Sequence, residues 1–146
     1  MAEVNKSVLV AHSAARMFDL VDAVEKYSEF LPWCGGSECM FRDPQITRAA
    51  VHINYRGIRQ SFSTENAKIP PRQMQIKLIE GPFRMLEGSW KFTDFAGAGC
   101  KVELSLRYEF SSRLLEKLVG PVFGYIANSM VDAFVKRADS IYGQNA

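Results

Sequence analysis

The last third of the chain constrains the fold most, because an alternating strand runs directly into a long amphipathic helix. Apolar and polar side chains alternate from Val102 to Phe110, the period-two pattern of a strand with one buried and one wet face. Apolar residues then recur every third or fourth position from Leu115 to Ile141, which predicts a helix from about residue 112 to 142. About 30 helical residues span about 45 Å. We therefore expect this helix to lie across a whole curved sheet and to leave an apolar space beneath it.

Earlier apolar runs predict the remaining elements, and turn residues separate them. The expected order is a strand, two short helices and five strands before the final strand and helix. Short connections, including a turn at 97–99, imply antiparallel hairpins. The strands are expected at 4–11, 37–42, 47–55, 59–69, 72–79 and 85–95, and the short helices at 14–22 and 25–30.

Two local features qualify this outline. Gly35 and Gly36 predict a flexible turn before the second strand. Pro121 interrupts the long helix pattern, because proline removes a backbone hydrogen bond and clashes with the preceding turn. A kink or a restart is expected there. It would either let the helix follow the sheet or hinge the entrance to a cavity.

Composition indicates one globular domain over residues 1–146, with 47% hydrophobic and 23% charged residues. Runs of 18 apolar residues and the apolar stretch of a signal peptide are both missing from the sequence. We therefore expect a cytoplasmic protein, with at most peripheral contact at the inner membrane. Three cysteines, an odd number, argue against a disulfide framework.

Patterns typical of catalysis or metal binding are not found in the sequence. His12 and His52 are far apart and lack metal-ligand spacing, and Cys34 with Cys39 lacks a second pair for zinc. We interpret the histidines as surface or capping residues, the thiols as buried, and Asp22 as a helix-surface carboxylate. The sequence therefore predicts no catalytic residues, no metal and no enzyme.

Four segments of the chain carry a resemblance to a known family. They are 18–22 with 24–27, 30–34 (Phe-Leu-Pro-Trp-Cys), 81–90, and 108–110 running into 120–123 and 130–134. With the order of elements, these segments resemble the coenzyme Q-binding START-domain family of the START-like helix-grip superfamily. The resemblance implies an α+β fold, in which a seven-stranded curved antiparallel sheet grips the long helix and two short helices follow the first strand. It also implies a tunnel between sheet and helix.

Members of that family bind ubiquinone and support respiration, or bind the large ribosomal subunit and block subunit joining as toxins. The resemblance does not choose between these roles. It implies no catalytic residue, and no cofactor apart from ubiquinone as a bound ligand.

We take binding of an isoprenoid quinone or a similar lipid as the leading hypothesis. Apolar burial contributes about 25 cal/mol per Å², so several isoprene units bind well even without a polar anchor. Trp33 is expected at the mouth, and Tyr55 and Tyr108 either bond a head group or fill the core. The expected lining is Trp33, Tyr55, Phe62, Met74, Ile76, Trp90, Leu106, Tyr108, Phe123, Ile126, Met130 and Phe134.

The alternative hypothesis is docking on the ribosome through a basic strand face. Residues 42–91 hold nine Lys/Arg and four Asp/Glu, a net +5. Such a face is either solvated surface or a site for RNA phosphates or anionic headgroups; DNA is not an expected partner. The expected outward residues are Arg56, Arg59, Lys68, Arg72 and Lys77.

Overall fold

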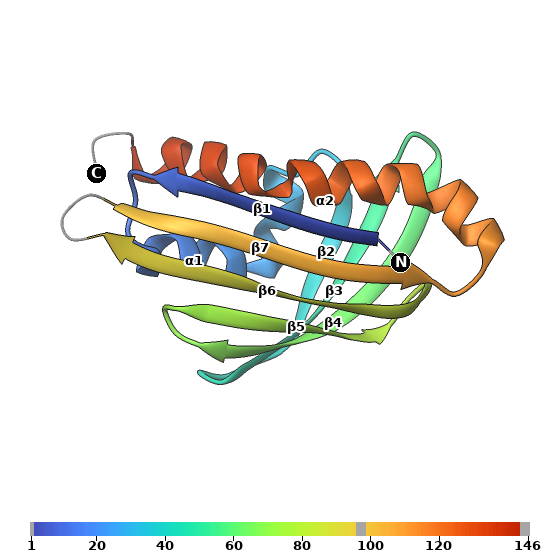
Figure 1. Ribbon diagram of the computed structural model, residues 1–146, viewed down its shortest axis with the longest axis horizontal. Helices are drawn as coiled ribbons and strands as arrows, with labels where there is room; N and C mark the ends of the chain where they lie inside the picture. Colours follow the sequence, from blue (N-terminus) through green and yellow to red (C-terminus); the bar gives the residue numbers. More distant parts are fainter. Residues whose placement is uncertain (1, 96–98, 144–146) are drawn as a thin grey trace.

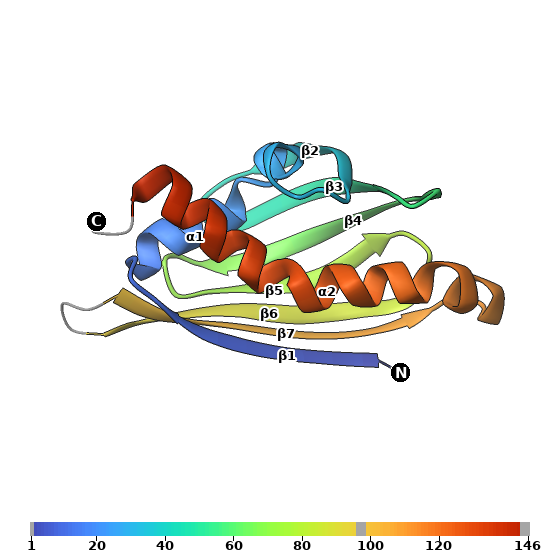
Figure 2. The ribbon, with the colours of Figure 1, turned by 90° about the horizontal axis from the view of Figure 1, so that it is seen from above.

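The computed structural model describes residues 2–95 and 99–143, which form one curved sheet gripping a long helix (Figures 1 and 2). The seven strands are all antiparallel and lie in the order β1-β7-β6-β5-β4-β3-β2. The elements are β1 (Ala2–Val10), α1 (Ala14–Asp22), the 3-10 helix η1 (Val24–Glu29), β2 (Cys34–Arg42), β3 (Ile46–Tyr55), β4 (Ile58–Ile69), β5 (Gln73–Glu80), β6 (Phe83–Phe95), β7 (Gly99–Phe110) and α2 (Arg113–Tyr142). The α+β helix-grip prediction is confirmed.

The core lies between the inner face of the sheet and α2. On β7 the inward residues from Val102 to Phe110 are buried, as their alternation predicts. On α2 the buried residues recur at three- and four-residue spacing from Val119 to Ala138. By length and hydropathy alone, α2 is long and apolar enough to span a membrane. Its buried side nevertheless belongs to the same core cluster as the strands.

Helix α2 begins where Ser112 accepts a hydrogen bond from the backbone of Leu115, and it ends at Gly143. It continues through Pro121 without a restart, and its first turns bend away from the axis of the rest (Figure 1). These turns extend beyond the ends of the strands. Leu118, expected in the buried stripe, is therefore 56% exposed.

Two local predictions are wrong. Gly35 and Gly36 lie inside β2, not in a turn. A Cβ at Gly35 would stand 2.9 Å from the Asn54 Cβ, so β2 needs glycine there for close approach to β3. His12 is 1% exposed, and its Nε2 lies 2.7 Å from Asp139 Oδ1, because the chain after β1 packs against the end of α2. The second short helix is confirmed, and it is a 3-10 helix. The turn expected at 97–99 lies largely outside the described residues, which exclude 96–98.

Candidate functional site: the cavity between the sheet and helix α2

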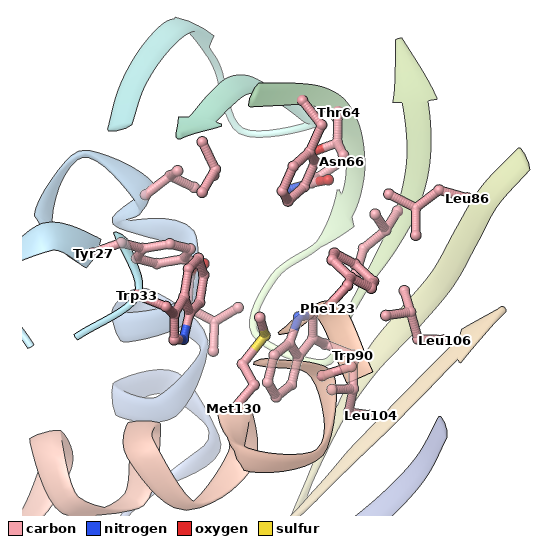
Figure 3. A pocket seen from close by; sticks show the side chains of 16 residues that line it. Tyr27, Trp33, Thr64, Asn66, Leu86, Trp90, Leu104, Leu106, Phe123 and Met130 are labelled. Atoms are coloured by element: carbon pink, nitrogen blue, oxygen red, sulfur yellow. The ribbon is translucent and has the colours of Figure 1, made fainter. Parts of the chain in front are cut away.

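A cavity of about 80 Å³ lies between the sheet and α2. Figure 3 shows side chains from the strands, from α2 and from the α1–η1 end surrounding it. Most of its wall is apolar, which suits an apolar ligand group. The lining residues are Val21, Val24, Tyr27, Trp33, Val51, Phe62, Thr64, Asn66, Ile76, Leu86, Trp90, Leu104, Leu106, Phe123, Ala127 and Met130.

Regular secondary structure places these side chains. On α2, Phe123, Ala127 and Met130 follow one another at four and three residues, so they share the face that meets the sheet. On β4 every second residue from Phe62 points inward, which brings Thr64 and Asn66 to the cavity wall. The register pairs Asn66 with Ile76 of β5, so a polar and an apolar wall residue are neighbours.

Seven of the twelve expected lining residues stand at the cavity: Trp33, Phe62, Ile76, Trp90, Leu106, Phe123 and Met130. Trp33 is 2% exposed. It also borders a surface groove formed with Phe30, Pro32, Tyr125 and residues of the second half of α2. The indole of Trp33 therefore separates the cavity from this groove.

The five others lie in the surrounding core or at its edge. Tyr55 stacks on Tyr125, with ring centroids 5.4 Å apart. Tyr108 packs edge-on against Phe123, with ring centroids 4.7 Å apart. Burial raises the pKa of the Tyr108 hydroxyl. Phe134 packs against Tyr27 and Trp90. Met74 and Ile126 are almost completely buried outside the cavity wall.

Sequence reasoning missed the polar part of the wall. Asn66 Oδ1 is buried and accepts no hydrogen bond from the described residues. The hydroxyl of Tyr27 donates to the carbonyl of Val21, and burial raises the pKa of Tyr27 far above its ordinary value. The signal that would have found Thr64 and Asn66 is the alternation of β4, continued from Phe62. The other missed residues are Val21, Val24, Val51, Leu86, Leu104 and Ala127.

A charge cluster, buried at Lys68 and partly exposed at Arg42 and Glu25, joins α1 and η1 to the sheet at one end of the cavity. Asp22 accepts hydrogen bonds from Lys68 Nζ at 3.0 Å and from Thr47 Oγ1 at 2.7 Å. Arg42 bonds Glu25 at 2.7 Å, and this bond lowers the pKa of the Glu25 carboxyl. The placement of Lys68 on an outward basic face, and of Asp22 as a helix-surface carboxylate, is therefore wrong. Lys68 continues the inward alternation of β4, and its side chain is 3% exposed.

The four other basic residues are exposed but do not form one patch. Arg56 and Arg59 lie at the β3–β4 end of β4, and Arg72 follows its far end. At about 3.3 Å per residue, the two ends of this strand are separated by roughly 36 Å along the strand. Lys77 pairs across the sheet with Glu65 and Glu87. The two hairpins that carry these residues therefore present separate basic sites.

The described residues hold no group of three His, Cys, Asp or Glu placed to hold a metal ion. What the site offers chemically is an apolar enclosure with hydrogen-bonding groups on one wall.

The sequence matches the family described as Polyketide cyclase / dehydrase and lipid transport over residues 10–135. The chain belongs to this family. It is 41% identical to the ribosome association toxin RatA of Vibrio cholerae, over 99% of this chain and 100% of that protein. The corresponding Escherichia coli protein is 37% identical, over 97% and 90% of the two chains. Identity is 29% to the mitochondrial coenzyme Q-binding protein COQ10 homolog B of Xenopus laevis, over 97% of this chain and 60% of that protein.

Solved structures of the family's fold agree with this assignment. The Zhui aromatase/cyclase from Streptomyces superposes with a TM-score of 0.78 at 15% identity, over 94% of this chain and 93% of that chain. A START superfamily protein from Mycobacterium smegmatis superposes with a TM-score of 0.74 at 20% identity, over 95% of this chain and 98% of that chain. At these identities the likeness shows the fold alone. The resemblance noted from the sequence is confirmed.

Proposed function

We propose that this protein binds a hydrophobic ligand of the isoprenoid quinone class between its sheet and α2, without transforming it. The observation that carries the proposal is the partly open cavity between sheet and helix, which is apolar apart from a few polar groups such as Thr64 and Asn66 on β4. A quinone has the same division into a long apolar tail and a small polar ring. The family description, which includes lipid transport, and the name of the Xenopus relative support the proposal. The protein would act in the cytoplasm and collect its ligand at the inner membrane.

The cavity must widen to admit such a ligand. Its 80 Å³ is about half of the roughly 150 Å³ that holds benzene in an engineered cavity. Met130 supplies adaptability, because a methionine side chain has three rotatable bonds and fits irregular shapes. Trp33 separates the cavity from the groove beside α2. Rotation of its indole would join the two spaces, and the tail would then leave through the groove.

Titration of the purified protein with a short-chain ubiquinone tests this proposal, with tryptophan fluorescence as the signal because Trp33 and Trp90 line the cavity. Met130→Trp fills the space and should weaken binding at least tenfold. Met40→Trp makes the same change at a 55% exposed site on β2 and should bind as the wild type does. Absence of wild-type binding, or equal binding by Met130→Trp, contradicts the proposal.

A second candidate function is association with the large ribosomal subunit, with subunit joining blocked as in a toxin-antitoxin system. Relatives that are 36–41% identical over nearly the whole chain carry the name ribosome association toxin. Exposed arginines at the two ends of β4 supply cations for RNA phosphates. Contacts of this kind weaken steeply with salt and recognise the shape of the RNA backbone.

Co-sedimentation with ribosomal subunits at low and moderate salt tests this candidate. Because the arginines form two separate sites, Arg56→Glu with Arg59→Glu is tested apart from Arg72→Glu. At least one of these variants should lose subunit binding, while Lys6→Glu, an exposed change on the edge strand β1, should not. If both sediment as the wild type does, neither site contacts the ribosome.

A further inference from the structure

The cavity wall carries a fully buried side-chain oxygen without a partner among the described residues. Asn66 Oδ1 is buried and accepts no hydrogen bond from the described residues. Leaving such an acceptor unpaired in a low-dielectric interior is unfavourable, so native structures seldom retain one without a reason. The neighbouring inward positions of β4 hold Thr64 and Lys68.

Two donors at this end of the cavity, Lys68 and Tyr27, are already engaged. Lys68 directs its ammonium group to Asp22 at 3.0 Å. The hydroxyl proton of Tyr27 goes to the carbonyl of Val21. The Asn66 carbonyl oxygen is therefore left for a molecule that enters the cavity.

An amide oxygen only accepts hydrogen bonds, so its partner must be a donor. Thr64 stands two residues away on the same wall, and its hydroxyl can both donate and accept. A hydroxyl group on a ligand fits this pair, because it donates to Asn66 and accepts from Thr64. A carbonyl or ether oxygen facing Asn66 Oδ1 would leave that oxygen unpaired, because neither group donates a hydrogen bond; such a ligand could pair only with the amide nitrogen of Asn66 or the hydroxyl of Thr64.

We infer that Asn66 accepts a hydrogen bond from a hydroxyl group of the ligand, so that the cavity selects a hydroxyl-bearing aromatic amphiphile over its carbonyl or ether counterpart. For the quinone class this means that the reduced quinol binds more tightly than the oxidised quinone. The inference rests on the proposed function, because it names the form of ligand that the same cavity takes.

The surroundings of Asn66 orient such a ligand. Thr64 and Asn66 stand together on one side of the cavity, and Trp90, Phe123 and Met130 stand on the other (Figure 3). The hydroxyl then points toward β4 and the ring packs against the aromatic residues. The apolar tail extends toward Trp33 and the groove beside α2.

Calorimetric titration with 4-nonylphenol and its methyl ether, 4-nonylanisole, isolates the hydroxyl. The two probes share the same ring and tail and differ in one donor. The wild-type protein should bind the phenol about fivefold to tenfold more tightly, the ratio expected from one hydrogen bond. Asn66→Leu keeps the approximate volume and removes the acceptor, so the ratio should fall to about one. Asn5→Leu, the same change on the exposed side of β1, should keep the wild-type ratio.

The outcomes separate the two ideas. If the wild type binds both probes equally, or if Asn66→Leu keeps the preference for the phenol, the inference is overturned while the ligand-binding function stands. If the wild type binds neither probe, the proposed function fails and the inference fails with it. Circular dichroism of Asn66→Leu checks that the variant is folded, and Asn66→Gln, which keeps an amide oxygen, should restore part of the preference.

Discussion

Lys68 Nζ lies 3.0 Å from Asp22 Oδ2, an ion pair that joins the end of β4 to the end of α1. Removing the lysine leaves the Asp22 carboxylate with only Arg42, whose Nε lies 3.5 Å from the same oxygen, as its cationic partner among the described residues. Lys68→Met should therefore lower the free energy of unfolding by about 3 kcal/mol, as measured by urea denaturation. The matched control is Arg48→Met, which breaks the exposed pair with Glu65 and should change stability by less than about 1 kcal/mol. Equal losses in the two variants would contradict a buried role for Lys68.

Asn66→Leu should have the opposite effect on stability. It removes a buried acceptor that lacks a protein partner, so the free energy of unfolding should rise by about 1 kcal/mol. Asn5→Leu on the exposed face should leave stability within about 0.5 kcal/mol. A gain in stability together with a loss of phenol preference is typical of a residue kept for binding. A clear loss of stability would mean that Asn66 has a structural partner.

The pH dependence of stability should contain a contribution from Glu25. Its hydrogen bond to Arg42 lowers the pKa of the carboxyl below its ordinary value of 4.5. A lowered pKa in the folded state stabilises the protein above the unfolded value, and this contribution disappears as pH falls through the folded value. Between about pH 6 and pH 3, Glu25→Gln should therefore lose less stability than the wild type. Parallel curves in urea denaturation would contradict this.

The three thiols should differ in reactivity. Burial raises the pKa of Cys34, and it raises the pKa of Cys100 to about 11. Thiolates are the reactive species, so both should resist alkylation at neutral pH. Cys39 is only half-buried and should react first with iodoacetamide. Peptide mass mapping over time checks this order, and modification of Cys100 before Cys39 would contradict the packing described around β7.

The sequence predicts the fold in some detail because local patterns record it directly. The alternation around Leu104 and the stripe around Phe134 identify a half-buried strand and a core-facing helix. Neither pattern records the curvature of the sheet. Curvature decides that Met130 reaches the cavity while Ile126, on the same helix, is packed away from it.

The errors about the basic surface come from contacts between residues that are distant in the sequence. Lys68 is one of the basic residues of the 42–91 segment expected on the outer face, although its position in the β4 alternation is inward. A charge of this kind is buried only when a partner meets it, and Asp22 is 46 residues away along the chain. Arg56 and Arg72 belong to the same basic segment of the sequence. The pairing of β4 with β3 and β5 nevertheless places them at opposite ends of β4. Long-range pairing of this kind cannot be seen in a single sequence.

The central claim is that a hydrophobic ligand occupies the space between β4 and α2. A crystal structure of the protein with a short-chain ubiquinol tests it most directly. The claim predicts ligand density against Thr64 and Asn66, with Met130 and Trp33 displaced and the cavity larger than its present 80 Å³. An unchanged cavity at saturating ligand, or a ligand bound only elsewhere on the surface, would contradict it.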